Sequence, residues 1–364
     1  MKEPLLKLLL FTGSLFISLA ALECGARFLP DLTRSQELDL AMRRQQLDPN
    51  TSGNQCKLSQ AKAPIQIASL GGSAVLGHPM GPDAAFSKHL DGLLNERFPG
   101  KFQVHNLGAL SKDSFYLKYC ADEIIRHGSL DYIIIYAGHN DFINLGSRYP
   151  DRIIFLKKHP ALTRALLYVH KHSALLRWLT DTGHEKHFQM NYESFQRTKQ
   201  TIIRQFGANL DDIYQQAQKN KVTLIVSTLV SNIYERPPFD SVVGPEAVSA
   251  AHHFQEAKAL YAAGKFNSAL AEFKLARDLD TRSWRAPSEF NQFIRDFARE
   301  RPNILLLDFE KILENSNPQH FQGCNYFGDR NYCDHMHPNS LVHKLIADSL
   351  YKIIIRNETL RAPK

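Results

Sequence analysis

Three short groups of residues carry side chains that suit nucleophilic attack on a carbonyl. The first is Gly71-Gly72-Ser73, in which two glycines precede a serine. Glycines let a chain turn sharply from a strand into a helix, which would expose the Ser73 hydroxyl at the edge of a sheet. The alternatives are an ordinary glycine-rich turn and a phosphate-binding loop. The segment lacks the lysine of a P-loop and the spacing of a dinucleotide-binding fingerprint.

The second group supplies hydrogen-bond donors. Gly108 ends the segment Asn106-Leu107-Gly108, and Asn140 lies within Gly138-His139-Asn140-Asp141. A glycine can present a bare backbone N–H, and an asparagine side chain is a neutral donor. Acyl transfer needs such donors where negative charge develops on the carbonyl oxygen. A plain turn is the alternative for any single glycine or asparagine.

The third group is the segment Cys333-Asp334-His335-Met336-His337-Pro338. Asp334 and His337 are three residues apart, close enough for the carboxylate to hold the imidazole in one tautomer. His335 is interpreted as an exposed neighbour or a packing residue. The alternative is a metal site, built from these three side chains with Cys324 and Cys333. A disulfide suits the two cysteines better in an oxidising compartment.

The elements that must position these groups alternate between strands and helices. Five short apolar runs bounded by Gly, Pro or Asn predict strands buried on both faces, at Pro64–Leu70, Phe102–Leu107, Tyr132–Tyr136, Val222–Leu229 and Ile304–Phe309. Helical patterns lie at Ala84–Arg97, Ser114–His127, Tyr192–Asn220 and from Ser340 to about Ile355. This alternation predicts an α/β protein with a parallel sheet covered by helices. Ligands of such sheets gather at the carboxyl ends of the strands.

Together the three groups resemble the SGNH, or GDSL, hydrolase family. Its four marker residues occur in the expected order as Ser73, Gly108, Asn140 and His337. Gly72 stands where the family usually has Asp. The resemblance runs from about Pro64 to Ile355, with long inserts. It implies a flavodoxin-like, three-layer α/β sandwich around a five-stranded parallel sheet.

The resemblance also implies the role of each residue. Ser73 attacks an ester carbonyl, His337 takes the serine proton and later activates water, and Asp334 orients His337. The backbone N–H groups of Ser73 and Gly108 and the Asn140 side chain form the oxyanion hole. Neither a metal nor an organic cofactor is needed. The expected substrate is a small acyl ester or an acylated glycan or lipid, such as an O-acetyl ester of a cell-envelope glycan.

Two other functions remain open. The same residues could transfer an acyl group to an acceptor other than water. In the second alternative, the protein binds a partner and its hydrolase cleft is idle, although the complete Ser, Asn, Asp and His set argues against this.

Residues 1–30 resemble a membrane-targeting segment. Lys2 and Lys7 precede an uncharged apolar run, Leu8–Leu22, which Glu23 closes. We expect an uncleaved signal anchor that spans the membrane, with a cleaved signal peptide and a buried helix as alternatives. Positive charge ahead of the run sends the rest of the chain outward. The expected location is therefore membrane-anchored, with the catalytic domain periplasmic or at the cell surface.

An outward orientation permits disulfides. Cys24 lies at the membrane edge, and the four remaining cysteines allow three pairings that sequence alone cannot separate. Cys324 with Cys333 is the pairing we favour, because it closes a short loop and leaves Cys56 for Cys120.

The composition limits the classes of protein to which the chain can belong. Its 364 residues carry 44 Lys+Arg and 37 Asp+Glu, a net charge of 44 − 37 = +7. A hydrophobic content of 43% excludes a disordered chain, and a mean hydropathy of −0.31 excludes a bundle of membrane spans. Residues 142–206 contain 11 Lys+Arg and 4 Asp+Glu, and 11 − 4 = +7. For a chain sent outward, this charge indicates anionic glycan or lipid headgroups and not nucleic acid.

The predicted organisation is a linker at residues 31–62 and a hydrolase domain at 63–364 with two inserts. The basic insert, 142–191, should contain an amphipathic helix at Pro160–Leu179. That helix could cover the active site, lie on a membrane surface or pack one face on the core.

The second insert, 250–285, resembles one tetratricopeptide repeat. Its pattern from Phe254 to Asp280 predicts two short antiparallel helices joined near Gly264, with a generic helical hairpin as the alternative. A single repeat cannot bury its own faces, so we expect it to dock on the hydrolase core and to offer a site for a protein partner. Arg285 and Asn291, just past the repeat, are candidate substrate contacts.

Overall fold

The computed structural model describes residues 14, 18–24, 56–127, 129–146, 150–173, 175, 191–242, 249–316 and 334–361. The strands are β1 Ile65–Gly71, β2 Phe102–Gly108, β3 Tyr132–Tyr136, β4 Thr223–Ser227 and β5 Ile304–Leu307. The helices are α3 Ser73–Leu76, η2 Pro82–Ala84, α4 Phe86–Arg97, α5 Ser114–His127, α6 His139–Leu145, α7 Pro150–Lys158, α8 Pro160–His172, α10 Tyr192–Lys219, α11 Ala250–Ala262, α12 Phe266–Asp278, α13 Ser288–Glu300, α14 Phe309–Ser316 and α15 Ser340–Arg361.

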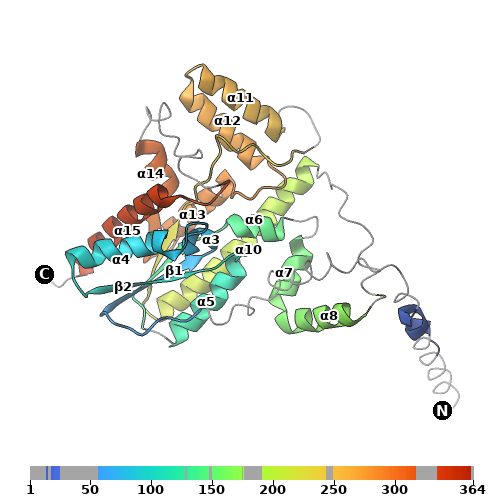
Figure 1. The fold of residues 1–364 in the computed structure, drawn as a ribbon, viewed down its shortest axis with the longest axis horizontal. Helices are drawn as coiled ribbons and strands as arrows, with labels where there is room; N and C mark the ends of the chain where they lie inside the picture. Colours follow the sequence, from blue (N-terminus) through green and yellow to red (C-terminus); the bar gives the residue numbers. More distant parts are fainter. Residues whose placement is uncertain are drawn as a thin grey trace, which may run out of the picture. The chain divides into compact units, whose positions relative to one another are not determined.

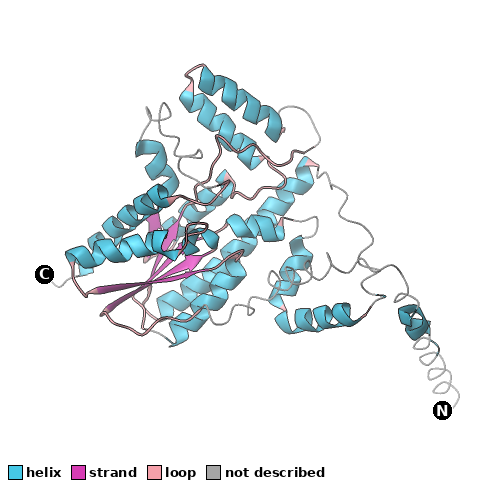
Figure 2. Cartoon of the chain, in the orientation of Figure 1, coloured by secondary structure: helices cyan, strands magenta, loops and turns pink. Residues whose placement is uncertain are grey.

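The strands form one parallel sheet in the order β2-β1-β3-β4-β5. This is the flavodoxin-like order of a doubly wound sheet. Helices cover both faces (Figures 1 and 2): α4 and α15 pack together over one, and α5 and α10 over the other. The predicted fold class is confirmed, because buried apolar strands linked by helices can hide their surface only in such layers.

The strand order reverses direction between β1 and β3, which are neighbours in the sheet. Ser73 follows β1 directly, and Asn140 follows β3. Loops at such a switch point separate and leave a crevice at the carboxyl edge of the sheet, where ligands bind. The topology therefore brings the first two groups of reactive side chains to one place.

The insert at 250–285 contains two packed helices, α11 and α12, joined at Gly264, whose φ is +74°. Phe254 and Phe273 lie inside the hairpin with ring centroids 5.6 Å apart. Tyr234, from the segment after β4, lies 4.5 Å from Tyr261 and 5.4 Å from Phe273, between ring centroids. The predicted helical hairpin is present and packs on this segment. Its identity as a tetratricopeptide repeat and its protein partner stay predictions.

A disulfide joins Cys56 to Cys120 on α5, the pairing that the sequence analysis left for these two residues. Six residues further along the chain, the Lys62 backbone N–H donates to Gln103 Oε1 over 2.7 Å. The chain is thus attached to α5 at residue 56 and to β2 at residue 62, both within the segment that was predicted to be a linker. Cys324, Cys333 and residues 31–55 lie outside the described residues.

The chain divides into two compact units, one of residues 1–51 and 155–188 and one of residues 52–154 and 189–364. In the first, the Ser173 hydroxyl and the Leu175 N–H both donate to Glu23, over 2.7 and 3.0 Å. The predicted helix over Pro160–Leu179 is shorter than expected. It ends at His172, because Ser173 has extended backbone angles.

The predicted membrane anchor lies mostly outside the described residues, which include only 14 and 18–24 of the first thirty. None of the helices in the described part of the chain is both long and apolar enough to cross a membrane.

Candidate active site

Ser73 is the first residue of α3, immediately after the turn that leaves β1. Its side chain is buried. Gly77 ends this one-turn helix with a left-handed φ of +93°, a conformation that glycine adopts without a steric penalty. The short helix holds the Ser73 hydroxyl at the carboxyl edge of the sheet.

Ser73, His337 and Asp334 form a continuous chain of hydrogen bonds. His337 Nε2 lies 2.6 Å from Ser73 Oγ, and His337 Nδ1 lies 2.5 Å from Asp334 Oδ2. Asp334 Oδ1 also accepts the backbone N–H groups of Met336 and His337, over 2.8 and 2.9 Å. One carboxylate therefore shapes the loop and orients the imidazole, as a nucleophile–base–orienter arrangement requires.

The electrostatics keep Asp334 ionised. Burial alone would raise its pKa, but the hydrogen bonds from the His337 ring and from the two N–H groups outweigh burial. The pKa of Asp334 therefore lies well below its ordinary value, and the group is a carboxylate at neutral pH.

The Asn140 amide lies directly against Gly72. Its Nδ2 donates to the Lys112 carbonyl over 2.8 Å, and because an amide nitrogen has two hydrogens, one remains for a ligand. A Cβ placed on Gly72 would lie 2.3 Å from this nitrogen. The φ of Gly72 is −82°, which any residue can adopt. Glycine therefore suits this position because it lacks a side chain, and not because of its backbone flexibility. The Asn140 amide thus lies in the space that a side chain at position 72 would occupy.

Asp141 has a supporting role that the sequence analysis did not assign. Its carboxylate is fully buried and accepts the Ser114 hydroxyl over 2.5 Å and the Ser114 N–H over 3.2 Å. These bonds attach α6 to the start of α5, just after the Lys112 carbonyl that holds Asn140. In the sequence, this supporting role was indicated only by the position of Asp141 directly after Asn140.

Gly108 lies where β2 passes α3. A Cβ there would be 2.2 Å from the Leu76 backbone nitrogen, so only glycine fits. The Gly108 N–H donates to Asn106 Oδ1 over 2.9 Å, and Asn106 Nδ2 donates to the Val75 carbonyl over 2.9 Å. The Asn106 side chain thus already occupies the Gly108 N–H, which the sequence analysis assigned to the oxyanion hole. The role of Gly108 in the oxyanion hole stays a prediction.

His139 links α6 to the segment before α13. Its Nδ1 accepts the Ala286 N–H over 2.9 Å, and its Nε2 lies 3.3 Å from the Val230 carbonyl. Burial lowers the pKa of His139 to about 3, although the bond to Val230 opposes the shift. His139 is therefore neutral at physiological pH and acts as a structural connector.

Arg285 and Asn291, the candidate substrate contacts, are both buried and held by protein partners. Arg285 donates to the Asn232 and Arg236 carbonyls over 2.9 Å each and to Asp280 over 3.3 Å. Asn291 exchanges two hydrogen bonds of 2.8 Å with the backbone of Leu229. These contacts give both side chains structural roles. Contact with substrate stays an untested prediction.

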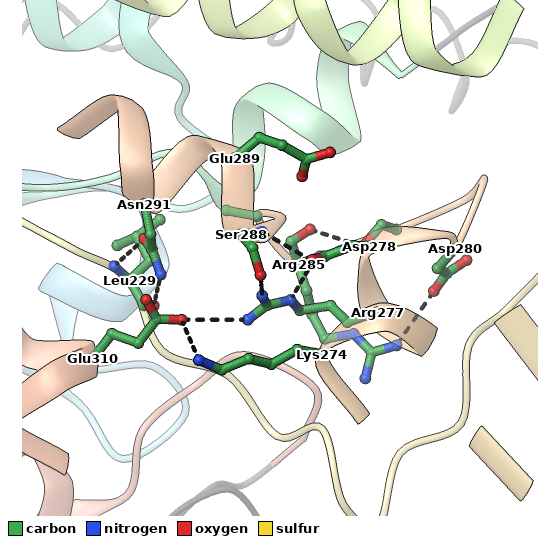
Figure 3. A network of polar contacts seen from close by, with 12 residues as sticks. Leu229, Lys274, Arg277, Asp278, Asp280, Arg285, Ser288, Glu289, Asn291 and Glu310 are labelled. Carbon is green, nitrogen blue, oxygen red and sulfur yellow. Dashed lines mark hydrogen bonds and ion pairs between the residues drawn. The ribbon is translucent and has the colours of Figure 1, made fainter. Parts of the chain in front are cut away.

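Figure 3 shows the polar network around Arg277, beside these residues. Arg277 donates to Asp278 and to Ser288, over 2.9 and 2.7 Å, and lies 4.0 Å from Glu310. Burial opposes the charge of Arg277, but the three neighbouring carboxylates raise its pKa, and it stays cationic. The network holds α12, α13 and α14 together.

A metal centre was the alternative for the segment that contains Asp334 and His337. Across the described ranges no three His, Cys, Asp or Glu side chains come together in a way that suits a metal ion. Cys324 and Cys333, which that alternative requires, lie outside these ranges.

No protein-family model matches the chain, and no curated protein matches its sequence. Solved structures with a similar fold include a lipolytic protein of the G-D-S-L family from Veillonella parvula, 12% identical with a TM-score of 0.42 over 80% of this chain and 99% of that one. A catalytic mutant of an acetylxylan esterase from Geobacillus stearothermophilus is 12% identical, with a TM-score of 0.42 over 81% and 96%. A lipase/acylhydrolase from Enterococcus faecalis is 11% identical, with a TM-score of 0.39 over 79% and 94%.

Proposed function

We propose that this protein is a serine hydrolase of the SGNH type that cleaves carboxylic esters. The observation that carries the proposal is the chain of hydrogen bonds from Asp334 through His337 to Ser73. It couples a hydroxyl to a base that can take its proton, and the base to a carboxylate that can stabilise the resulting imidazolium.

In the proposed reaction, Ser73 Oγ attacks the ester carbonyl while its proton passes to His337 Nε2. The carbonyl oxygen becomes an oxyanion that faces the Ser73 N–H and the remaining Asn140 hydrogen. When the intermediate collapses, the alcohol leaves with the proton from His337, and Ser73 carries the acyl group. Water then attacks the acyl-enzyme with His337 as its base, the acid is released, and Ser73 regains its proton. Each donor to an oxyanion stabilises the transition state by about 2.7–4 kcal/mol.

The proposed location is outside the cytoplasm, on a membrane anchor. The apolar run Leu8–Leu22 behind two lysines and the disulfide Cys56–Cys120 support it, since disulfides persist in oxidising compartments.

The first experiment compares wild-type protein with Ser73→Ala on p-nitrophenyl acetate. We expect the substitution to lower kcat by at least about a thousandfold, because it removes the nucleophile. Ser349→Ala is the matched control, since the Ser349 hydroxyl bonds only its own helix, at the Leu345 carbonyl. Equal turnover by wild type and Ser73→Ala would refute the assignment of the nucleophile. A fluorophosphonate probe that failed to label the folded wild type would favour an idle cleft.

A further inference from the structure

The ring of His78 packs against the ring of the proposed base, His337. The two ring centroids lie 4.8 Å apart, and the planes of the rings cross at 72°. This edge-to-face geometry is one that aromatic pairs prefer. His78 is the exposed member of the pair, and His337 is buried. His78 belongs neither to the hydrogen-bonded chain that ends at Ser73 nor to the oxyanion hole, so the proposed reaction leaves this contact without a role.

His78 lies in the loop that follows α3, and this loop is bonded to the elements of both the nucleophile and the base. The His78 N–H donates to the Ser73 carbonyl over 3.0 Å. Two residues further along, Met80 Sδ accepts the hydroxyl of Ser340, the first residue of α15, over 3.3 Å. The loop therefore connects the helix that carries Ser73 with the helix that follows His337. Its backbone gives the His78 ring a fixed place beside the base.

The His337 ring is held differently before and after the first half of the proposed reaction. In the free enzyme, its Nδ1 is bonded to Asp334 and its Nε2 to Ser73. In the acyl-enzyme, Ser73 Oγ is part of an ester and has no proton to donate to Nε2. Only the bond to Asp334 then remains of the two, and one hydrogen bond does not stop the ring from turning about it. The His78 ring packs where it opposes that rotation.

We propose that His78 is a positioning residue for deacylation, whose ring holds the His337 imidazole in place while Ser73 carries the acyl group. The proposal rests on the proposed esterase function and adds a residue to one of its steps. In this step a water proton passes to His337 Nε2 as the water oxygen bonds the acyl carbon, and the proton then passes to Ser73 Oγ as the acid leaves. A displacement of about 1 Å in a reacting group can cost on the order of 10²-fold in rate.

The test measures the two halves of the reaction separately on p-nitrophenyl acetate. Rapid quenching and mass spectrometry follow the gain and the loss of an acetyl group on Ser73. We expect His78→Ala to lower the rate constant of deacetylation about threefold to tenfold, the range of one aromatic pair. The rate constant of acetylation should stay unchanged, because Ser73 itself bonds the base in that step. A loss of general structural integrity would lower both.

His78→Phe should restore deacetylation to the wild-type rate. Phenylalanine keeps a ring against His337 but has no nitrogen, so this rescue separates packing from any proton transfer by His78. His127→Ala is the matched control, since it removes an exposed imidazole from the last residue of α5. It should change neither rate constant.

Three results would overturn the role of His78. The first is a deacetylation rate constant that His78→Ala leaves unchanged. The second is a fall of equal size in both rate constants, or one confined to acetylation. The third is a loss in His78→Phe as large as that in His78→Ala, which would assign the effect to the imidazole nitrogens. The melting temperature of each variant, which should equal that of the wild type, shows that the fold is intact.

The same measurement separates this proposal from the esterase assignment. Acetylation of the wild type but not of Ser73→Ala would support the nucleophile, whatever the result for His78→Ala. If the wild type neither acquired an acetyl group nor turned over the ester, the esterase assignment would fail, and the role of His78 in deacylation with it.

Discussion

At the scale of single residues, the site depends on the absence of a side chain at position 72, where the residue is glycine. Gly72 lets the Asn140 amide approach the turn that carries Ser73. Asn140 in turn is held by the Lys112 carbonyl, whose loop is fixed through Ser114 to Asp141. An oxyanion donor is effective only if it is fixed before the reaction begins. The motif around Asn140 therefore contributes both a donor and the contacts that hold it.

Gly72→Ala should reduce activity and leave the fold intact. The new Cβ would lie 2.3 Å from Asn140 Nδ2 and 3.3 Å from the Lys112 carbonyl oxygen, so the end of the Asn140 side chain must move away and the backbone at Lys112 must shift slightly. We expect kcat on p-nitrophenyl acetate to fall by about 10²–10³-fold, the usual effect of losing one oxyanion donor, with a nearly unchanged melting temperature.

Gly92→Ala is the matched control, because nothing lies within 4 Å of a Cβ at that position. It should keep full activity. If Gly72→Ala kept activity within threefold of wild type, the position of the Asn140 amide would not matter for the reaction.

At the scale of elements, each reactive residue lies at an end that its element fixes. Ser73 begins α3 after β1, Asn140 lies in the first turn of α6 after β3, and His337 precedes α15. Because β1 and β3 are neighbours with the order reversed, their following loops frame a single crevice. Arg285, the last residue of the second insert, donates to the Asn232 and Arg236 carbonyls and so attaches this insert to the segment after β4.

The disulfide between Cys56 and Cys120 should stabilise the fold. It closes a loop with a sequence separation of 64, and a loop of that length corresponds to roughly 4 kcal/mol in the chain-entropy model. We expect Cys56→Ala to lower the free energy of unfolding by up to about that amount, measured by urea denaturation.

Cys24→Ala is the control for the loss of one sulfur atom, since Cys24 is exposed and unpaired among the described cysteines. It should leave the unfolding midpoint unchanged. Dithiothreitol should destabilise the wild type more than Cys56→Ala, in which only the predicted Cys324–Cys333 disulfide is left to reduce. Equal sensitivity of the two proteins to the reductant would show that this disulfide does not form.

At the scale of the whole molecule, buried histidines couple the stability of the fold to pH. His139 connects loops at the carboxyl edge of the sheet, and His343 on α15 accepts the Phe86 N–H of α4 over 3.2 Å. Burial lowers the pKa of His139 to about 3 and that of His343 to about 4, with nearby imidazoles adding to the shift of His343. The fold therefore holds both histidines in the neutral form.

Stability should fall as the pH drops below about 6.5, the ordinary pKa of histidine. Below this pH the unfolded chain binds protons that the folded chain cannot. Each histidine with a lowered pKa in the fold therefore reduces the free energy of unfolding, until the pH reaches its pKa in the folded state. Between pH 7 and pH 5 each should remove about 2 kcal/mol from the free energy of unfolding.

Urea denaturation at the two pH values measures the loss. His343→Asn should reduce the loss by about 2 kcal/mol, the share of one such histidine, and His127→Asn, which removes an exposed imidazole, should not change it. A free energy of unfolding that is the same for the wild type at both pH values would contradict the buried neutral state of these histidines.

The sequence by itself determined the strands, most of the helices and the order of the reactive residues. Local periodicity and flanking breakers predicted Ser114–His127 and Tyr132–Tyr136 with the bounds that the structure has, because buried strands and amphipathic helices leave strong local patterns. The motif residues were recognisable for a similar reason, since their types and short spacings reflect the chemistry of the site. The helix that starts at Pro160 was overestimated, because the apolar pattern continues beyond Ser173 where the helix ends.

Only the tertiary structure decided which distant residues meet. It showed that Arg285 is buried and bonded to Asn232 and Asp280, and it placed the Asn106 amide on the Gly108 N–H. It also placed the Asn140 amide against Gly72, where a Cβ would not fit without movement of that amide. It also brought together Phe239, Trp284 and His335, which no pattern in the sequence links. Local patterns report on neighbours along the chain. Contacts across 45 to 96 residues, such as those among these rings, depend on how the layers pack.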